Sequence, residues 1–298
     1  MHYFEGGEGP PIVMVHGLGS SAGLEFRFNL EALAGRHRVI APDLPGFGQS
    51  DKPQVPYTMP FFVETLGTFL EQVGITRAAV LGISFGGRVV LGHALRKPER
   101  VEKLILVDSL GLGAPRRVMA YRLLLTRGIG ELMMTSTATA LRRLSPVTVR
   151  RFWGWYLNRP KSVEHLLSDS RIQDHGRMMN APGYQAAYLA TLRSLAARSS
   201  LRDGVALDRE LRELSMPVLL VWGRHDHLFP PSHAQAAAAV LPNARVEIFE
   251  EAGHTPQMEE PERFNRLVLD FLAEGATPTL PSPEGEGDQG SGWPNRPA

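Results

Sequence analysis

The chain has 298 residues, of which 43% are hydrophobic and 21% charged, and its 32 basic and 31 acidic residues leave a net charge of +1. This balance excludes a strong electrostatic attraction to nucleic acid or to an anionic membrane, so a small molecule is the expected partner. The absence of cysteine excludes disulfides, thiolate metal sites and a cysteine nucleophile. With neither a signal-peptide pattern nor an apolar run of membrane-spanning length, we predict a cytoplasmic protein, either a monomer or a homodimer.

Short apolar runs alternate with helical periods in the first half of the chain, and the same pattern returns near the end. Nearly continuous apolar strands separated by helices indicate a parallel sheet that is covered on both faces. The predicted strands cover residues 11–17, 38–46, 78–84, 102–109, 216–223 and 244–250, and the predicted helices cover 26–35, 59–74, 86–97, 232–241 and 261–275.

The strand pattern disappears in the middle of the chain, where amphipathic segments rich in Arg, Met and aromatic residues take over. A helical insertion at the carboxyl ends of a parallel sheet is the expected place for a lid. The Pro/Gly/Ser-rich end has too few apolar residues to fold and is predicted to be disordered. We therefore divide the chain into a first core part (1–110), a helical lid (111–203), a second core part (204–274) and a disordered tail (275–298). The predicted lid helices cover 118–128, 147–157, 162–172 and 183–196.

One serine stands between glycines, where the strand 78–84 gives way to a helix. Gly82 and Gly86 flank Ser84 in the pattern Gly-Ile-Ser-Phe-Gly. This pattern between a strand and a helix is typical of a nucleophile elbow, a strained turn that exposes the serine hydroxyl. The glycines are needed because larger side chains would collide with the neighbouring strand and helix. Ser84 is therefore the predicted nucleophile.

A serine nucleophile needs a base to take its proton and a carboxylate to orient that base. His254 lies in a loop after the strand 244–250, and loops at the carboxyl ends of strands collect the catalytic groups of an open α/β sheet. Asp226 ends another strand and is the predicted acid, while Asp108, after the strand 102–109, is the alternative. Other histidines, including His2 and His93, are interpreted as exposed loop residues.

An oxyanion formed at the serine needs amide donors. The amide of Phe85, at the start of the helix, is one predicted donor, and that of Leu18, after His16-Gly17, is the other. Gly19 is the alternative donor in this glycine-rich loop. His16 is interpreted as a structural residue that holds the loop by a hydrogen bond.

No metal site is predicted, because His225 and His227 beside Asp226 lack a third clustered ligand, and no cofactor is expected. The Met and Trp residues of the insertion suggest an apolar, adaptable substrate pocket. The candidate substrate-binding residues are Gly17, Gly19, Trp153, Arg171 and Met178.

Together these motifs resemble the α/β-hydrolase fold superfamily. The resemblance rests on His-Gly at 16–17, DLPGFGQSDKP at 43–53, GISFGG at 82–87, GRHDHLFP at 223–230 and GHTPQMEEPERFNRLVLDFL at 253–272. It implies a mostly parallel central sheet flanked by helices with a helical lid insertion, and Ser-His-Asp chemistry through an acyl-enzyme. It also implies an antiparallel hairpin of two strands at the start. Because few residues precede the strand 11–17, we expect the first strand of this hairpin to be absent unless the N-terminus is incomplete.

Within this superfamily the chain is most similar to the meta-cleavage-product hydrolases, which cut carbon–carbon bonds in ring-fission products and use a lid arginine to bind a dienoate carboxylate. Arg171 and Arg177 are candidates for that arginine. Those enzymes usually carry Asn and Met where this chain has Ile83 and Phe85, and Trp where it has Thr255. These departures favour cleavage of carboxylic esters of small to medium apolar substrates, with carbon–carbon hydrolysis as the alternative. A cofactor-free perhydrolase or haloperoxidase and a non-catalytic ligand-binding relative are further alternatives.

Overall fold

A single sheet organises the protein. A computed structural model describes residues 1–113, 119–143, 148, 168–197, 207–275 and 295–297. The strand order is β7-β6-β5-β4-β2-β3-β1-β8. The strands are β1 (His2–Gly6), β2 (Pro11–Val15), β3 (Arg38–Pro42), β4 (Ala78–Ile83), β5 (Val101–Val107), β6 (Val218–Gly223), β7 (Ala244–Phe249) and β8 (Asn295–Pro297).

Strands β2 to β7 run parallel to one another, whereas β1 is antiparallel to β3 and β8 is antiparallel to β1. Every residue of β4 and β6 is buried, as the apolar runs in the sequence predict for strands covered on both faces. The predicted α/β fold with a mostly parallel sheet is thus confirmed. The chain passes from β2 out to β3 and returns on the other side of β2 as β4. Ligands of open α/β sheets bind at the carboxyl edge where the strand order reverses in this way.

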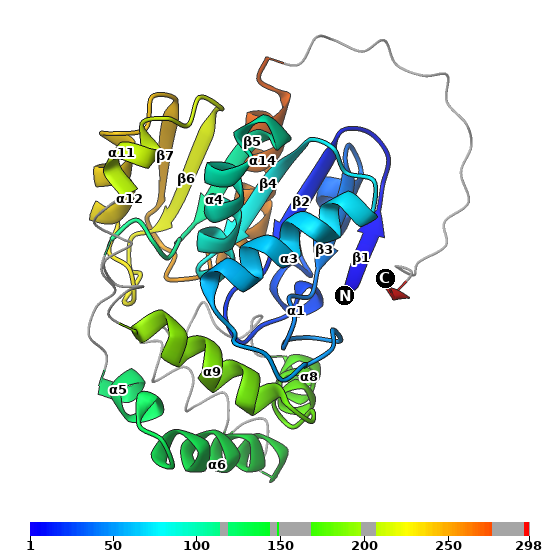
Figure 1. Cartoon of the computed structure of the whole chain (residues 1–298). Coiled ribbons are helices and arrows are strands. Elements are labelled where there is room, and N and C mark those ends of the chain that lie inside the picture. Colours follow the sequence, from blue (N-terminus) through cyan, green and yellow to red (C-terminus); the bar gives the residue numbers. More distant parts are fainter. Residues whose placement is uncertain (114–118, 144–147, 149–167, 198–206, 276–294, 298) are drawn as a thin grey trace.

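Two apolar clusters cover the two faces of the sheet, because alternate residues of a strand point to opposite faces. Val13 and Val15 belong to one cluster, and Ile12 and Met14 to the other. Figure 1 shows α3 and α4 on one face and α14 on the other. The core helices are α1 (Ala22–Glu25), α2 (Leu30–Ala34), α3 (Met59–Gln72), α4 (Phe85–Arg96), α11 (Leu207–Leu211), α12 (Ser232–Ala238), α13 (Pro256–Glu259) and α14 (Pro261–Ala273), with a short 3-10 helix at Pro98–Arg100.

The chain between β5 and β6 contains further helices, which form a separate layer below the sheet in Figure 1. They are α5 (Met119–Leu125), α6 (Ile129–Arg143), α8 (Asp169–Met179) and α9 (Tyr184–Ala196). The sequence does not predict α6, because its Ser and Thr residues have low helix propensity and obscure the apolar period. The predicted helix 147–157 lies outside the described residues, apart from residue 148.

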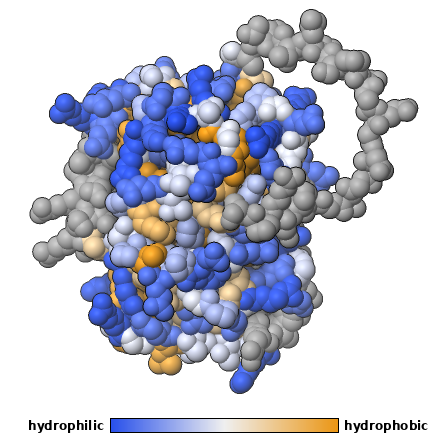
Figure 2. Space-filling model, turned by 45° about the vertical axis from the view of Figure 1, so that its right-hand side comes forward, coloured by the Kyte–Doolittle hydropathy of each residue, from blue (hydrophilic) through white to orange (hydrophobic). Residues whose placement is uncertain are grey.

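The surface is mostly hydrophilic on the face shown in Figure 2, with small apolar patches near its middle. Among the described residues, the large apolar side chains with substantial exposure are Leu123, Ile129 and Leu132, all in α5 or α6. No helix in the described part of the chain is long and apolar enough to cross a membrane.

The amino-terminal strand departs from the sequence analysis. No element is predicted before residue 11, yet β1 pairs with β3, because edge pairing can order a short strand whose mixed residues give little apolar signal. The interpretation of His2 and His93 as exposed loop histidines is wrong, since they lie in β1 and α4 and both are buried. His2 Nδ1 lies 2.9 Å from Asp43 Oδ2. Asn295–Pro297, within the tail predicted to be disordered, pairs with β1.

Candidate active site

Ser84 lies at a strained turn between β4 and α4. Its backbone angles, φ 52° and ψ −115°, fall in a region that residues other than glycine rarely adopt. Two backbone hydrogen bonds fix the turn: the Ser84 amide donates to Val107 O at 2.9 Å, and the Leu110 amide donates to Ser84 O at 2.9 Å. This is the backbone geometry that a nucleophile elbow requires.

The flanking glycines leave no room for a side chain. A Cβ on Gly82 would collide with the carbonyl group of Gly86, and a Cβ on Gly86 would collide with the carbonyl oxygens of Val15 and His16. The start of α4 therefore packs directly against the end of β2. Only glycine at both positions allows the helix to begin so close to the sheet.

His254 and Asp226, the predicted base and acid, lie in hydrogen-bonding contact. His254 Nδ1 is 2.8 Å from Asp226 Oδ2. Asp226 is 2% exposed, and its Oδ1 accepts hydrogen bonds from the amides of Leu228 at 2.7 Å and Phe229 at 3.1 Å. Burial lowers the pKa of His254, but the charge and hydrogen bond of Asp226 outweigh it, so the pKa lies above its ordinary value. Conversely, burial raises the pKa of Asp226, yet His254 brings it below its ordinary value.

Asp108, the alternative acid, lies at the same place. It is fully buried after β5, and its Oδ1 accepts a hydrogen bond from the Gly223 amide at 3.1 Å. One side-chain ligand atom each from Asp108, Asp226 and His254 lies within 4.8 Å of the others, close enough for a metal ion to be held. Burial and then the charge of Asp226 raise the pKa of Asp108 well above its ordinary value. The structure therefore brings both candidate acids to one histidine.

The loop after β2 adjoins Ser84. The position of a Cβ on Gly17 would be 3.6 Å from Ser84 Cβ, so the backbone that leads to Leu18 passes beside the serine. Gly19 has a φ of +80°, and its carbonyl accepts a hydrogen bond from the buried Tyr184 hydroxyl of α9 at 2.8 Å. The insertion thus holds the loop that carries the second predicted oxyanion donor.

His16 is a structural residue of this loop, as the sequence analysis interprets it. Its Nδ1 lies 2.8 Å from Gly17 O, and the Leu44 amide donates to its Nε2 at 3.0 Å. Both ring nitrogens are therefore engaged by the backbone. Phe85, whose amide is the first predicted donor, is the first residue of α4, where an N–H has no partner within the helix.

Two buried polar residues beside the site are missed by the sequence analysis. Glu25 is 6% exposed and Gln257 is fully buried, and Gln257 Nε2 donates to Glu25 Oε1 at 2.8 Å. Glu25 Oε2 is 3.6 Å from the position of a Cβ on Gly17, the same distance as Ser84 Cβ. The only signal in the sequence is a single charge among the small and apolar residues 22–26.

Of the two candidate arginines, Arg171 faces the core and Arg177 faces away from it. Arg171 Nη2 donates to Leu24 O at 3.3 Å and to Met258 Sδ at 3.5 Å. Its Nη1 is buried and has no partner among the described residues, and burial lowers the pKa of this side chain to about 10. Arg177 is exposed and forms an ion pair with Asp174 on its own helix.

The remaining candidates contribute less. Met178 is 8% exposed and belongs to the apolar cluster on the α3 and α4 face of the sheet, together with other residues of the insertion. It therefore packs the insertion against the core. Trp153 lies outside the described residues.

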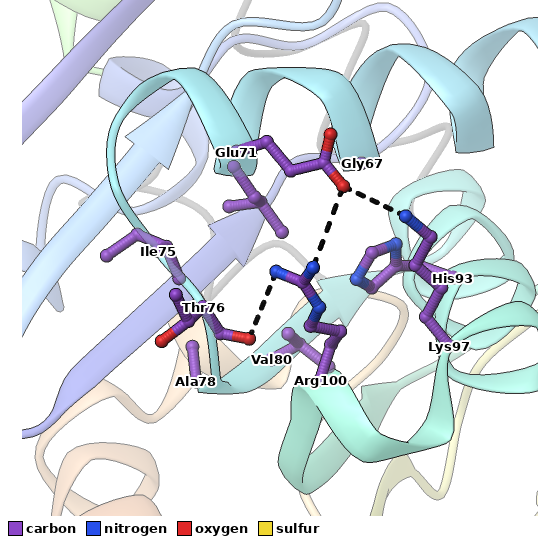
Figure 3. Close-up of a pocket in the computed structure, with 10 residues that line it drawn as sticks. Gly67, Glu71, Ile75, Thr76, Ala78, Val80, His93, Lys97 and Arg100 are labelled. Atoms are coloured by element: carbon purple, nitrogen blue, oxygen red, sulfur yellow. Dashed lines mark hydrogen bonds and ion pairs between the residues drawn. The ribbon is translucent and has the colours of Figure 1, made fainter.

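A small cavity lies away from the site, at the amino ends of the strands, near the start of β4 (Figure 3). Its volume is about 10 Å³, room for roughly one water molecule. Lys97 and Arg100 line it and pair with Glu71 at 2.9 and 3.9 Å. A cavity of this size, with its cations already paired, does not suit a substrate.

A mostly parallel sheet, a strained serine turn after β4 and a His–Asp pair at the carboxyl edge define an α/β hydrolase fold protein. A family model described as alpha/beta hydrolase fold matches residues 10–261. The chain therefore belongs to the α/β hydrolase family.

Comparison with known proteins shows which members of this family the chain resembles. The chain is 33% identical over 271 residues to an uncharacterized protein of Mycobacterium tuberculosis, with 89% of this chain and 76% of the relative covered. It is 31% identical over 271 residues to 2-hydroxymuconate semialdehyde hydrolase of Pseudomonas putida, covering 90% and 89%. Its structure is similar to that of the meta-cleavage product hydrolase of Pseudomonas fluorescens IP01, with a TM-score of 0.73, 26% identity and coverage of 92% and 94%. The predicted resemblance to meta-cleavage-product hydrolases is confirmed.

Proposed function

We propose that the protein is a serine hydrolase that cleaves a carbon–carbon bond in ring-fission products. The observation that carries this proposal is the 2.8 Å contact between His254 Nδ1 and Asp226 Oδ2, at the sheet edge where Ser84 occupies its strained turn. The similarity to 2-hydroxymuconate semialdehyde hydrolase supports this bond type over the ester that the motif departures favour. The ranking drawn from the sequence is therefore reversed.

In the proposed mechanism, the substrate dienol first ketonises, which makes the adjacent carbon–carbon bond cleavable. Ser84 Oγ then adds to the ketone carbonyl while His254 takes the hydroxyl proton and Asp226 stabilises the imidazolium. The amides of Phe85 and Leu18 donate to the oxyanion. When the carbon–carbon bond breaks, the leaving carbanion takes a proton from His254. Water activated by His254 then hydrolyses the acyl-enzyme and releases the acid.

Arg171 is the proposed binding group for the dienoate carboxylate. Its buried Nη1 lacks a partner among the described residues, and a guanidinium can pair with a carboxylate through two parallel hydrogen bonds. Arg177 serves as a matched control, because it lies on the same helix but is exposed and paired with Asp174. We expect Arg171→Gln to raise KM for a dienoate about tenfold or more and to leave a neutral ester nearly unaffected, with Arg177→Gln unchanged for both.

Ester cleavage is the second candidate function. Thr255 stands where the carbon–carbon hydrolases usually carry Trp, and its Oγ1 donates to Glu259 Oε1 at 3.1 Å. A polar, hydrogen-bonded side chain at this position gives no aromatic surface for a planar dienoate. This observation favours an ester substrate whose acyl group need not be a planar dienoate.

A parallel assay separates the two candidates. We expect turnover of a ring-fission dienoate to exceed that of short and medium p-nitrophenyl esters, and Ser84→Ala to abolish both activities. Turnover of the esters alone would reverse the ranking. A fluorophosphonate probe tests the broader class, since no adduct on Ser84 in folded protein would rule out a serine hydrolase.

A further inference from the structure

A second carboxyl group lies directly behind the proposed acid. Asp108 is fully buried at the end of β5, and its Oδ2 has no hydrogen-bond partner among the described residues. Side-chain atoms of Asp108, Asp226 and His254 lie within 4.8 Å of one another. We propose that Asp108 is a protonated acid that donates a hydrogen bond from Oδ2 to the carboxylate of Asp226, and that it is a positioning residue for the Asp226–His254 pair.

The proton belongs on Asp108 because two buried carboxyl groups at this distance cannot both ionise. Asp226 has three partners, the amides of Leu228 and Phe229 and the ring of His254. Asp108 has only the Gly223 amide, on its other oxygen. The carboxylate with more hydrogen-bond partners, that of Asp226, keeps the negative charge. The pKa directions agree: burial and the charge of Asp226 raise the pKa of Asp108, and the hydrogen bond from Asp108 helps to lower that of Asp226.

The backbone holds Asp108 in this position at a cost in strain. Its φ is 41°, and in the described part of the chain only Ser84 and Asp108 have positive φ without being glycine. Residues other than glycine rarely adopt a positive φ, and such a conformation persists where the surrounding structure fixes it. The Asp108 amide donates to Val221 O at 3.0 Å, which ties it to β6. The carboxyl group is thereby directed into the protein, toward the loop that carries Asp226.

Charged groups from three neighbouring segments face Asp108. Asp226 comes from the loop after β6, His254 from the loop after β7, and Glu259 from α13, and both acids raise the pKa of Asp108. A neutral donor at this position fixes the orientation of Asp226 without adding negative charge beside His254. An ionised Asp108 would instead stabilise the imidazolium and keep His254 protonated, and so inactive as a base, to higher pH.

This inference rests on the proposed function, because it assumes that Asp226 orients His254 as a base. The test compares Asp108→Asn, which keeps a neutral donor of the same shape, with Asp108→Leu, which removes the donor. In full-length protein, kcat/KM for the better substrate is measured from acid to neutral pH. We expect kcat/KM of Asp108→Asn to stay within about threefold of wild type, because a donor remains. The midpoint of its pH profile, meaning the pH at half-maximal kcat/KM, should be unchanged. Asp108→Leu should lose about tenfold to a hundredfold, with its midpoint raised, because Asp226 then holds the imidazolium proton more strongly.

A shift of the pH midpoints in the opposite direction would overturn the inference. If Asp108 is ionised in the wild type, both variants lose a negative charge beside His254, and both midpoints fall. Full activity of Asp226→Asn with an inactive Asp108→Asn would show that Asp108 is itself the acid of the triad. Asp226→Asn is otherwise expected to lose about 10⁴-fold in kcat. A divalent ion found by elemental analysis in the purified protein, and lost in Asp108→Asn, would show a metal in place of the proton.

A spectroscopic measurement keeps this test separate from the proposed function. In infrared spectra recorded at neutral pH, we expect the carbonyl band of a protonated carboxylic acid in the wild type and in Ser84→Ala. We expect this band to be absent in Asp108→Asn. The band does not depend on which bond the protein cleaves. Its absence from the wild type would refute the protonated Asp108, whereas its presence together with an active Ser84→Ala would refute only the serine mechanism.

Discussion

Gly86→Ala tests whether the nucleophile turn requires direct contact between α4 and β2. The added methyl group would meet the carbonyl oxygens of Val15, the last residue of β2, and of His16, which follows it. The Val15 oxygen cannot move aside easily, because Val15 is paired with Gly82 of β4. The helix must therefore shift, and with it the turn that carries Ser84.

The expected cost follows from this collision. Overpacking against fixed backbone destabilises a protein by about 1–3 kcal/mol, which for a domain of this size lowers Tm by roughly 3–10 °C. A displacement of the nucleophile of about 1 Å costs on the order of 10²-fold in rate. We therefore expect thermal unfolding to show a modest loss of stability and steady-state kinetics to show a loss of about 10²-fold in kcat/KM.

Gly35→Ala is the matched control. Gly35 has a helical φ of −62°, and a Cβ there would have its nearest neighbour at 3.6 Å. The same substitution should be neutral or stabilise by about 0.4–1 kcal/mol. If Gly86→Ala keeps wild-type Tm and activity, the contact between α4 and β2 is not what shapes the turn. Equal losses in both variants would show that the effect is not specific to the turn.

Further predictions concern the packing of the core and the surroundings of the site. Lys103→Met should lower the free energy of unfolding in urea by about 2–5 kcal/mol, because Lys103 Nζ donates to three carbonyls around the end of α14 at 2.6–2.7 Å; a loss below about 0.5 kcal/mol would contradict this. Tyr184→Phe removes the donor to Gly19 O and should lower kcat/KM about fivefold by loosening the oxyanion loop, whereas an unchanged value would show that the bond is dispensable. Since His254 acts as a base only when neutral and its pKa is raised above 6.5, kcat/KM should rise with pH through a midpoint above 6.5. Glu25→Gln should lower this midpoint, because the Glu25 charge contributes to raising that pKa; a rise would refute its electrostatic role.

The core elements follow from local sequence. The nearly continuous apolar runs predict β2 to β6, because strands covered on both faces need apolar residues at nearly every position, whereas the edge strand β7 is predicted from alternating apolar and polar residues. The motif around Ser84 predicts the turn, because only glycines fit its neighbours. By contrast, β1 is short and half-buried, so its ordering depends on pairing with β3. Residues of α6 carry a mixed pattern, and their packing against other helices decides their structure.

The electrostatic surroundings of the candidate site could not be predicted. Asp108 and Asp226 compete for one role in the sequence, because each ends a strand, and only the pairing of β5 with β6 brings them together. Gln257 and Glu25 are 232 positions apart, yet they share a hydrogen bond. Such contacts depend on tertiary structure, which leaves no local periodicity to detect.

The insertion leaves the core after β5 and the chain re-enters the core at β6, and these two strands are paired neighbours, with Leu104 opposite Val218 and Val107 opposite Val221. Because β5 and β6 run parallel, the chain leaves at the carboxyl end of β5 and re-enters at the amino end of β6, so the two junctions lie at opposite ends of neighbouring strands. A replacement segment must therefore carry the chain back along the length of the sheet, as every crossover between parallel strands does. A transplant from a relative that keeps this crossover is expected to alter substrate preference while the strands that lead to Ser84, Asp226 and His254 stay unchanged.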